Sequence, residues 1–407
     1  MQNPLDKRVK ACYTIIAMGN HAKTKIFLLN EMEKNKMAAT FEFVGKLKKI
    51  EKETEKFKAF EEKRYDSGWT NQTFKFNAIN GNNSHIMQIR AGFWSKKDGS
   101  VDDGKMKIYT QSKAEGGAKS QKMEVAFVDR ANPDILSRVA YFSKFGINLS
   151  TPGEAKDPSK DREFIFEGDF MTALRKLMDN PKFMERRVHI KGTMDIQYGE
   201  SKGVFYRTFV PSRVRFASDD EKDMMRLSID LIYGPDVIDE EEDVLRVNCY
   251  HGYYDANYRK DACKGQAMCP IQFVVREPKI FDLVRRRFTN FPDECTFAKT
   301  DVTLDVINGT EMVSLTYDDL SDDAKENIDF GLSTLEDEIR LAGGTVFGDR
   351  VTELLFASSR NVQGTAYEAE DLLPPRHDDA DDADDTKSDL SAEKKDEDED
   401  FDLFGDL

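Results

Sequence analysis

The sequence predicts a mainly β protein with a few helices, of the α+β class, whose strands form two tandem small β-barrels. Two observations support this prediction. Short segments with apolar residues at alternate positions recur between residues 41 and 276, and this is the period of a half-buried strand. One such pattern, with glycine at its third position, occurs twice and indicates an internal repeat; the glycine would let a long strand bend at a barrel corner. The two copies are Phe41, Phe43, Gly45 and Leu47, and Val188, Ile190, Gly192 and Met194.

Residues 1–36 are predicted to form a basic N-terminal arm, and residues 37–150 the first barrel with a following helix. Asn80-Gly81-Asn82-Asn83 predicts a hairpin turn, because Asn-Gly tolerates the positive φ that a tight turn needs. The expected strands of the first barrel are 41–47, 70–79, 84–93, 106–111 and 123–128, and its helix begins at Asn132-Pro133.

Residues 151–167 are rich in Pro, Gly, Lys and Asp and are expected to link the first barrel to a second one over 168–277. The second barrel is predicted to open with a helix over 170–178. Its expected strands are 188–194, 204–210, 228–233, 244–250 and 271–276. Five short strands per unit suit a small barrel of the OB type better than a βαβ unit.

Residues 278–362 are interpreted as an acidic α/β segment. Strands are expected at 302–307 and 311–316, followed by a helix over 320–339, where apolar residues recur every three or four positions. Residues 363–407 are predicted to be a disordered acidic tail.

The net charge of −16 is unevenly distributed. Residues 1–220 carry 40 Lys or Arg and 29 Asp or Glu, residues 221–367 carry 16 and 29, and residues 368–407 carry 4 and 18. This division favours a polyanion partner for the first half and a protein partner or a self-contact for the second. No apolar run approaches the roughly 20 residues of a membrane helix. The start has no secretory signal and the five cysteines suggest no disulfide framework, so a cytoplasmic protein without a membrane partner is expected.

Catalytic signatures are missing from the sequence. GxxxxGK[ST], GxGxxG, HExxH and GxSxG do not occur, and only five histidines are present to serve as bases. The sequence therefore favours a protein that is not an enzyme.

Aromatic and basic residues alternate on several predicted strands and loops. Binding of single-stranded nucleic acid needs rings for base stacking, worth about 1–3 kcal/mol per base, and cations for phosphates. Arg90 and Trp94 are expected to share one strand face and Phe93 to lie on the other. The candidate binding residues are Trp69, Lys75, Phe76, Arg90, Trp94, Tyr206, Arg207, Arg213, Arg215, Tyr253, Tyr254, Tyr258, Arg259 and Lys260. The competing interpretation places most of the rings in the barrel cores.

A second group of candidates consists of soft metal ligands around a predicted loop: Cys249, His251, Cys263 and Cys269. Four such residues suit a tetrahedral structural zinc site. Because no CxxC pair is present, buried cysteines that bind no metal are the competing interpretation.

The acidic tail ends in four apolar residues, Phe401, Leu403, Phe404 and Leu407. Disordered acidic segments with a few large apolar anchors make docking peptides, so this tip is expected to bind partner proteins. The acidic residues are also expected to compete with DNA for the protein's own basic groove. A tail that only keeps the protein soluble is the alternative.

This organisation resembles that of single-stranded DNA-binding proteins, especially the replication type encoded by large DNA bacteriophages. The resemblance implies sequence-independent coating of single strands in replication, recombination and repair. It also implies that Phe401 to Leu407 recruit replication or recombination proteins, and that an arm containing Lys7, Arg8 and Lys10 makes contacts between monomers on DNA. The Cys and His cluster is similar to the structural zinc site of one phage branch, although its spacing differs.

Three other functions stay open. An acidic interaction protein, a nucleic-acid mimic or a chaperone would act through its tail and would not bind DNA. A nuclease would use a scattered carboxylate site with magnesium. A phage structural or scaffolding protein would form large assemblies without nucleic acid.

Overall fold

The computed structural model describes a large central part of the chain. The described residues are 39–55, 57–94, 104–110, 121–153, 160–199, 202–241, 243–255, 266–291, 296–314, 317, 320–341, 345–365, 367 and 369–372. The predicted basic arm and most of the predicted acidic tail lie outside the described residues.

Most strands join one 14-stranded sheet, so the prediction of a mainly β protein with a few helices is confirmed. The strands of this sheet are β1 (Ala39–Lys48), β2 (Phe60–Arg64), β3 (Trp69–Asn80), β4 (Asn83–Trp94), β7 (Phe145–Asn148), β8 (Asp161–Phe164), β9 (Val188–Gly199), β10 (Val204–Phe216), β11 (Met224–Tyr233), β12 (Ile238–Glu241), β13 (Val244–Tyr254), β14 (Gln266–Val275), β15 (Ala298–Ser314) and β16 (Thr345–Gly364). β5 (Lys105–Thr110) and β6 (Gln121–Ala126) pair separately. The helices are α3 (Pro133–Arg138), α4 (Glu167–Met178), α5 (Pro181–Met184), α6 (Phe281–Thr289), α7 (Asp322–Asp329) and α8 (Leu335–Leu341), with 3₁₀ turns at Phe127–Asp129, Tyr141–Ser143, Pro278–Ile280 and Ala369–Leu372.

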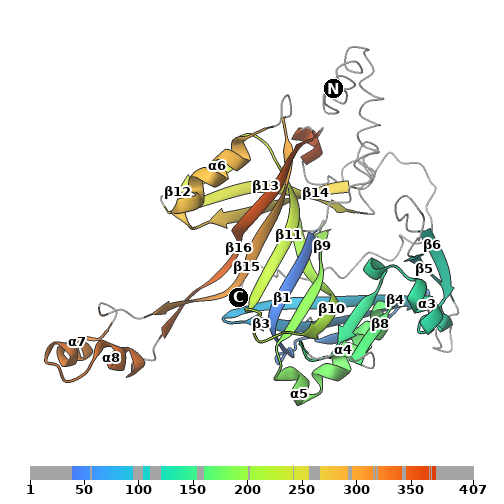
Figure 1. Cartoon of the computed structure of the whole chain (residues 1–407), viewed down its shortest axis with the longest axis horizontal. Coiled ribbons are helices and arrows are strands. Elements are labelled where there is room, and N and C mark those ends of the chain that lie inside the picture. Colours follow the sequence, from blue (N-terminus) through green and yellow to red (C-terminus); the bar gives the residue numbers. More distant parts are fainter. Residues whose placement is uncertain are drawn as a thin grey trace, which may run out of the picture.

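The strand pairings close two circuits of five strands with the same internal order. In the first circuit, β1 pairs with β3, β3 with β4, β4 with β10, β10 with β9, and β9 with β1. In the second, β11 pairs with β13, β13 with β14, β14 with β16, β16 with β15, and β15 with β11. Counted along the chain, the third and fifth strands of each circuit pair in parallel: β4 with β10, and β14 with β16. All other neighbours in the circuits are antiparallel. A helix precedes each fourth strand, α4 before β9 and α6 before β15 (Figure 1).

β1 joins the two circuits. Residues 39–44 pair with β11 on one edge and residues 40–45 with β9 on the other, whereas residues 46–48 pair with β3. The change of partner occurs at Gly45, where a Cβ would lie 2.3 Å from the carbonyl oxygen of Ile79. No side chain fits at such a close approach of backbones, so this strand needs glycine at its bend.

The division into two tandem barrels around residues 151–167 is not confirmed. β9 and β10, expected in the second barrel, close the first circuit with β1, β3 and β4. The strands expected at 106–111 and 123–128 are present as β5 and β6, but they form their own sheet. The two glycine-containing patterns belong to β1 and β9, which are neighbours in one circuit. The patterns are alike because each strand needs glycine where another backbone approaches closely.

The strand expected at 302–307 and the described part of the one expected at 311–316, residues 311–314, belong to one strand, β15. The residues between them resemble a turn, but Asn308 donates from Nδ2 to the carbonyl oxygen of Ser84 at 2.8 Å. A Cβ at Gly309 would lie 2.4 Å from the carbonyl oxygen of Asn82, so this glycine permits close packing rather than a turn. The long partner of β15, β16, was not predicted.

β15 and β16 continue beyond the second circuit as a two-stranded arm that carries α7 and α8 at its tip (Figure 1). The structure has two short helices, α7 and α8, where the sequence predicts one helix over 320–339. The helix is interrupted near Gly331, whose φ of +69° is not helical. Phe330 and Leu332 lie between the two helices and are exposed. None of the helices in the described ranges is long and apolar enough to cross a membrane.

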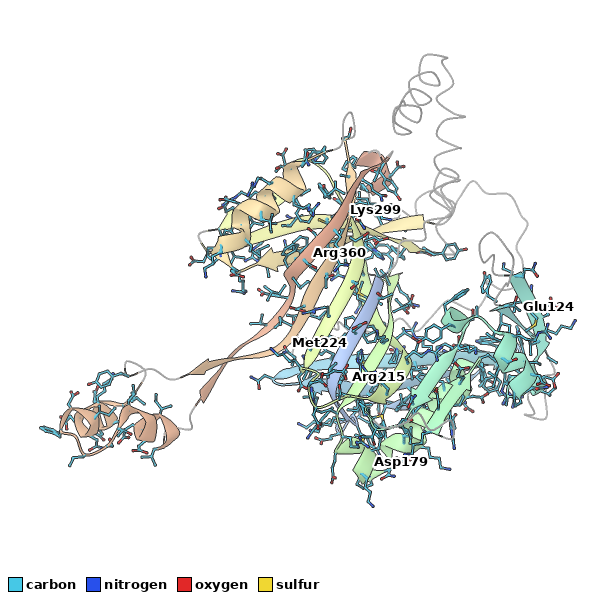
Figure 2. All side chains as sticks on the ribbon, in the orientation of Figure 1. Glu124, Asp179, Arg215, Met224, Lys299 and Arg360 are labelled. Atoms are coloured by element: carbon cyan, nitrogen blue, oxygen red, sulfur yellow. The ribbon has the colours of Figure 1, made fainter. Side chains whose placement is uncertain are left out.

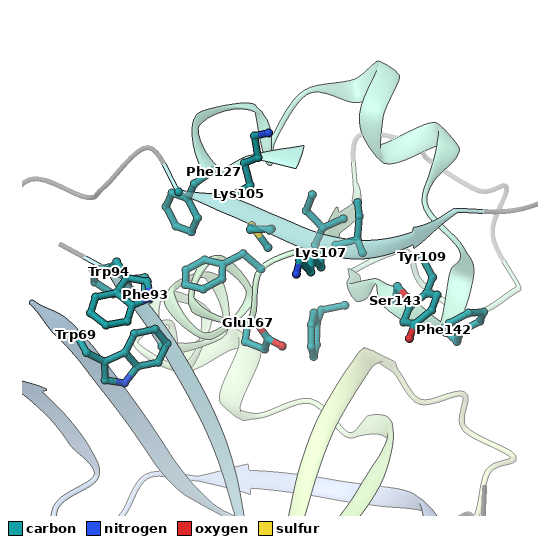
Figure 3. Close-up of a pocket in the computed structure, with 17 residues that line it drawn as sticks. Trp69, Phe93, Trp94, Lys105, Lys107, Tyr109, Phe127, Phe142, Ser143 and Glu167 are labelled. Atoms are coloured by element: carbon teal, nitrogen blue, oxygen red, sulfur yellow. The ribbon is translucent and has the colours of Figure 1, made fainter. Parts of the chain in front are cut away.

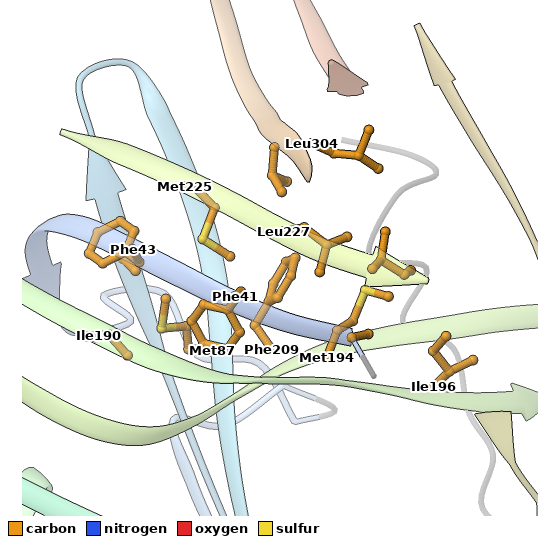
Figure 4. Packing of buried hydrophobic residues seen from close by; sticks show 14 of the residues in the cluster. Phe41, Phe43, Met87, Ile190, Met194, Ile196, Phe209, Met225, Leu227 and Leu304 are labelled. Atoms are coloured by element: carbon orange, nitrogen blue, oxygen red, sulfur yellow. The ribbon is translucent and has the colours of Figure 1, made fainter. Parts of the chain in front are cut away.

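One continuous hydrophobic core underlies both circuits. In the first circuit the ring of Phe41 lies edge-on to that of Phe209, with centroids 5.3 Å apart, beside the buried Met87 (Figure 4). In the second circuit Tyr233 and Phe288 pack with ring centroids 5.0 Å apart. β1 of the first circuit also pairs with β11 of the second, so apolar residues of both circuits belong to this one core.

Candidate nucleic-acid interface

The two tryptophans of the chain lie opposite each other at the end of the β3–β4 ladder. The ring centroids of Trp69 and Trp94 are 5.4 Å apart and their planes are inclined at 68°, an edge-to-face arrangement that aromatic pairs favour. The ring of Trp69 lies over Gly92, where a Cβ would come within 2.0 Å of it. Trp94 remains 44% exposed and is therefore available to another flat ring.

The tryptophan pair forms one wall of a pocket of about 530 Å³, called here the aromatic pocket (Figure 3). β5, the turn Tyr141–Ser143 and the start of α4 supply its other walls. Its volume falls within the roughly 300–1,000 Å³ of small-molecule sites. Eight aromatic rings of the described residues line it: Trp69, Phe93, Trp94, Tyr109, Phe127, Phe142, Phe145 and Phe166.

The rings differ in exposure across the pocket. Phe127 and Phe166 are buried, with centroids 4.9 Å apart, and hold the wall in place. Tyr109 and Phe142, whose centroids are 5.8 Å apart, are 38% and 69% exposed. Exposed rings on a buried aromatic base form a stacking platform for nucleobases.

Lysines accompany the exposed rings. Lys105, Lys107 and Tyr109 alternate along β5 with less exposed residues, so the three share one face. Lys122 of β6 places its Nζ 5.9 Å from the centroid of the Tyr109 ring. Lys105 Nζ lies 3.3 Å from Glu124, an exposed pair that contributes little stability and leaves the ammonium group near the pocket.

Lys75 and Arg90 lie on the same side of the β3–β4 ladder as the tryptophans, and these four residues define the outer face of β3–β4. The predicted shared face of Arg90 and Trp94 is therefore confirmed. Partial burial lowers the pKa of Lys75, whose Nζ lies 4.6 Å from the Phe57 ring centroid. Burial also lowers the pKa of Arg90, which donates from Nη1 to Gln197 Oε1 at 2.9 Å. Two cations in fixed positions near stacking rings can contact a phosphate backbone.

Phe76 and Tyr253 are corrections to the prediction. Phe76 is fully buried in the first circuit, and Tyr253 is 8% exposed and lies edge-on to Phe205. A ring without accessible faces cannot stack on a base, so both residues belong to the core, as the competing interpretation has it.

Three predicted arginines are held by protein groups. Arg207 donates to the carbonyl oxygen of Pro270 at 2.7 Å and so links the two circuits. Arg213 donates to the carbonyl oxygen of Tyr141 at 2.9 Å, and Arg215 bonds to both carboxylate oxygens of Glu221. Figure 2 shows Arg215 well apart from Glu124 of β6. These bonds hold the three arginines in place within the protein, and their predicted contact with nucleic acid stays a prediction.

The remaining predicted residues divide into two groups. Tyr206 is half-buried over Gly199, and Tyr254 is 72% exposed at the end of β13, away from the aromatic pocket. Those outside the described residues are Tyr258, Arg259, Lys260, Phe401, Leu403, Phe404 and Leu407.

The three described members of the predicted zinc set are buried: Cys249, His251 and Cys269. His251 donates from Nδ1 to the carbonyl oxygen of Asp230 at 2.8 Å. Burial raises the pKa of the Cys249 and Cys269 thiols. No group of three or more potential metal ligands converges within the described ranges. Because Cys263 lies outside the described residues, the zinc site stays a prediction.

The structure adds residues that were not predicted, Lys105, Lys107, Tyr109 and Phe142. The sequence carried a signal for the first three, because Lys-Met-Lys-Ile-Tyr alternates on a strand that was predicted. Phe142 gave no such signal, since only the fold brings its turn to β5.

No known protein family and no curated protein matches this sequence. One similar solved structure is that of a deletion mutant of the single-stranded DNA binding protein from Thermus aquaticus. The match has 6% sequence identity and a TM-score of 0.28, and it covers 67% of this chain and 88% of that one. A TM-score this low supports no conclusion about the function of this chain.

Proposed function

We propose that this chain binds single-stranded DNA and is not an enzyme. The observation that carries the proposal is the aromatic pocket, where exposed rings and lysines occur together. Trp94, Tyr109 and Phe142 offer stacking surfaces, and Lys105 and Lys107 lie beside them. Rings that stack on any base, next to cations that contact phosphates, produce binding without sequence preference.

The outer face of β3–β4 extends this surface beyond the pocket. A strand that stacks on Trp94 can continue toward Arg90 and Lys75, which lie on the same side of the ladder. Phosphate contacts supply much of the affinity and make it fall with salt, while stacking adds a contribution of about 1–3 kcal/mol per base.

Each five-strand circuit is proposed to be an OB-like barrel. The shared strand order, the parallel third and fifth strands and the helix before each fourth strand support this assignment. In OB-folds the face of the second and third strands binds oligonucleotides, and in the first circuit that face is the outer face of β3–β4.

The cellular role follows from the sequence resemblance. The chain is proposed to protect single strands during replication, recombination and repair, as in large DNA bacteriophages. The acidic tail would compete with DNA, and its tip, Phe401 to Leu407, would recruit replication proteins. Self-association on DNA through residues 1–36 belongs to the same proposal.

The chain allows a label-free test, because both of its tryptophans lie at the proposed site. Titration with a dT oligonucleotide should quench tryptophan fluorescence, and the affinity should fall as salt rises. Phe330→Ala, which removes an exposed ring from the distant arm tip, is the matched control and should bind like the wild type.

A titration without quenching or any other sign of binding would reject the proposal. Affinity for basic proteins instead of DNA would then favour the acidic interaction protein. Magnesium-dependent loss of the oligonucleotide would favour a nuclease.

A further inference from the structure

Glu167 is the one acidic residue among the described residues that line the aromatic pocket. Figure 3 shows it between the tryptophan pair and Phe142, with Lys107 nearby. No ion pair joins its carboxylate to a cation of the described chain, whereas Asp169, two residues along α4, is held by Arg130 Nε at 2.7 Å. Burial raises the pKa of Glu167, although the hydrogen bond that the carboxylate accepts from its own backbone N–H lowers it.

A carboxylate is out of place in a site that only contacts phosphates, because it repels them. Its position at the start of α4 suits the helix dipole, but that explains neither the surrounding rings nor the lack of an ion pair within the described chain. A partly buried carboxylate in a cleft is a candidate for ligand recognition. Ionised carboxylates only accept hydrogen bonds, so the ligand should present donors.

Among the DNA bases, guanine alone presents two adjacent donors, N1–H and N2–H, on its Watson–Crick edge. These two donors match the two oxygens of a carboxylate. Cytosine and adenine present one amino group beside an acceptor nitrogen, and thymine presents one N–H between two carbonyl oxygens. Single-stranded nucleic acids are read along this edge while their bases stack on aromatic rings.

We infer that the aromatic pocket takes one unstacked base and that Glu167 makes it prefer guanine. The inference rests on the proposed function and specifies the base that this site selects. The rings hold any base by stacking, and the carboxylate accepts the paired donors of guanine. Binding elsewhere along the strand stays independent of sequence.

The test compares dT oligonucleotides with others in which one central position is dG, dA or dC. Each unlabelled oligonucleotide competes with a labelled dT oligonucleotide for the full-length protein, and fluorescence anisotropy gives the affinity. The wild type should bind the dG oligonucleotide about fivefold or more tighter than dT, as expected for one bidentate contact to a base.

Two variants separate recognition from structure. Glu167→Gln presents one acceptor and one donor, so the ratio of dG to dT affinity should fall to about one. Asp134→Asn removes an exposed carboxylate that does not line the pocket and should keep the wild-type ratio. A purely structural role of Glu167 would change the urea midpoint of unfolding and leave the ratio unchanged.

Equal wild-type affinities for all four oligonucleotides would overturn this inference and leave the proposed function standing. A dG preference that survives in Glu167→Gln would also overturn it. Absence of binding to any oligonucleotide would overturn both.

Discussion

Trp69 and Trp94 stand directly opposite each other across β3 and β4, with ring centroids 5.4 Å apart, yet only Trp94 is exposed. The two rings therefore have different roles: Trp69 covers Gly92, and Trp94 offers a free face. Trp94→Ala should weaken binding to a dT oligonucleotide by about 1–3 kcal/mol and change the free energy of unfolding little. Anisotropy titration and urea denaturation measure the two effects, and unchanged affinity in the folded variant would contradict the assignment.

Lys107 should contact a phosphate, because it is exposed on β5 beside Tyr109. Lys107→Ala should reduce the slope of log affinity against log salt by about 1, since one counterion fewer is released. Lys182, exposed on α5, is the matched control, and Lys182→Ala should keep the wild-type slope. Titrations at four salt concentrations give the slopes, and equal slopes for both variants would count against the site.

Phe76 should matter for stability rather than for binding, because its ring is fully buried in the first circuit. Phe76→Ala should lower the free energy of unfolding by about 3–5 kcal/mol, the usual cost of removing a buried phenyl group. Urea denaturation measures this loss. A stable Phe76→Ala variant with weakened DNA affinity would restore the sequence-based interpretation of Phe76 as a stacking ring.

Gly45 should not tolerate a side chain. A Cβ there would lie 2.3 Å from the Ile79 carbonyl oxygen, so Gly45→Ala should destabilise the fold by about 3 kcal/mol or more. Gly104→Ala is the control, because no heavy atom lies within 4 Å of the added Cβ and the φ is not positive. Its unfolding free energy should stay within about 0.5 kcal/mol of the wild type. Thermal and urea unfolding of both variants would show whether the bend needs glycine.

His85 should make the fold sensitive to mild acid. Burial lowers the pKa of His85 to about 4, from 6.5 in an unfolded chain. Below pH 6.5 the unfolded state binds a proton that the folded state still excludes, so stability falls as the pH drops from 6.5 to 4. The loss from this group approaches about 3 kcal/mol. His85→Gln should remove this part of the slope when urea unfolding is measured across that range, and parallel wild-type and variant slopes would contradict it.

The strands could largely be predicted from the sequence, because alternation of apolar residues reports local geometry. Asn80 to Asn83 form the predicted turn, with Gly81 at φ +59°. The grouping of strands could not be predicted, because it depends on pairings between distant segments. The pair Asn308-Gly309 led to a wrong prediction for the same reason, because Asn-Gly is typical of a turn. The glycine is needed there because the backbone of Asn82, in the turn between β3 and β4, packs against Gly309.

The interface was predicted in part for a similar reason. Trp94 and Arg90 could be placed on one face by counting residues along a strand. Counting residues along a strand does not reveal, however, which groups an arginine bonds to within the protein. Glu221, which accepts hydrogen bonds from Arg215, comes from a loop with no sequence pattern of its own. Phe142 and Glu167 reach the aromatic pocket only because the segment between β4 and β9 folds back onto the first circuit.

The position of β1 between β9 and β11 also sets the order in which the chain can fold during synthesis. β1 is the first described strand to be made, but Phe41 lies opposite Gly192 on one edge and Leu227 on the other. At a synthesis rate of about 5–20 residues per second, these partners are made roughly ten seconds or longer after β1. Until then the edges of residues 39–44 stay unpaired and open to pairing with other nascent chains, whereas residues 46–48 can already pair with β3.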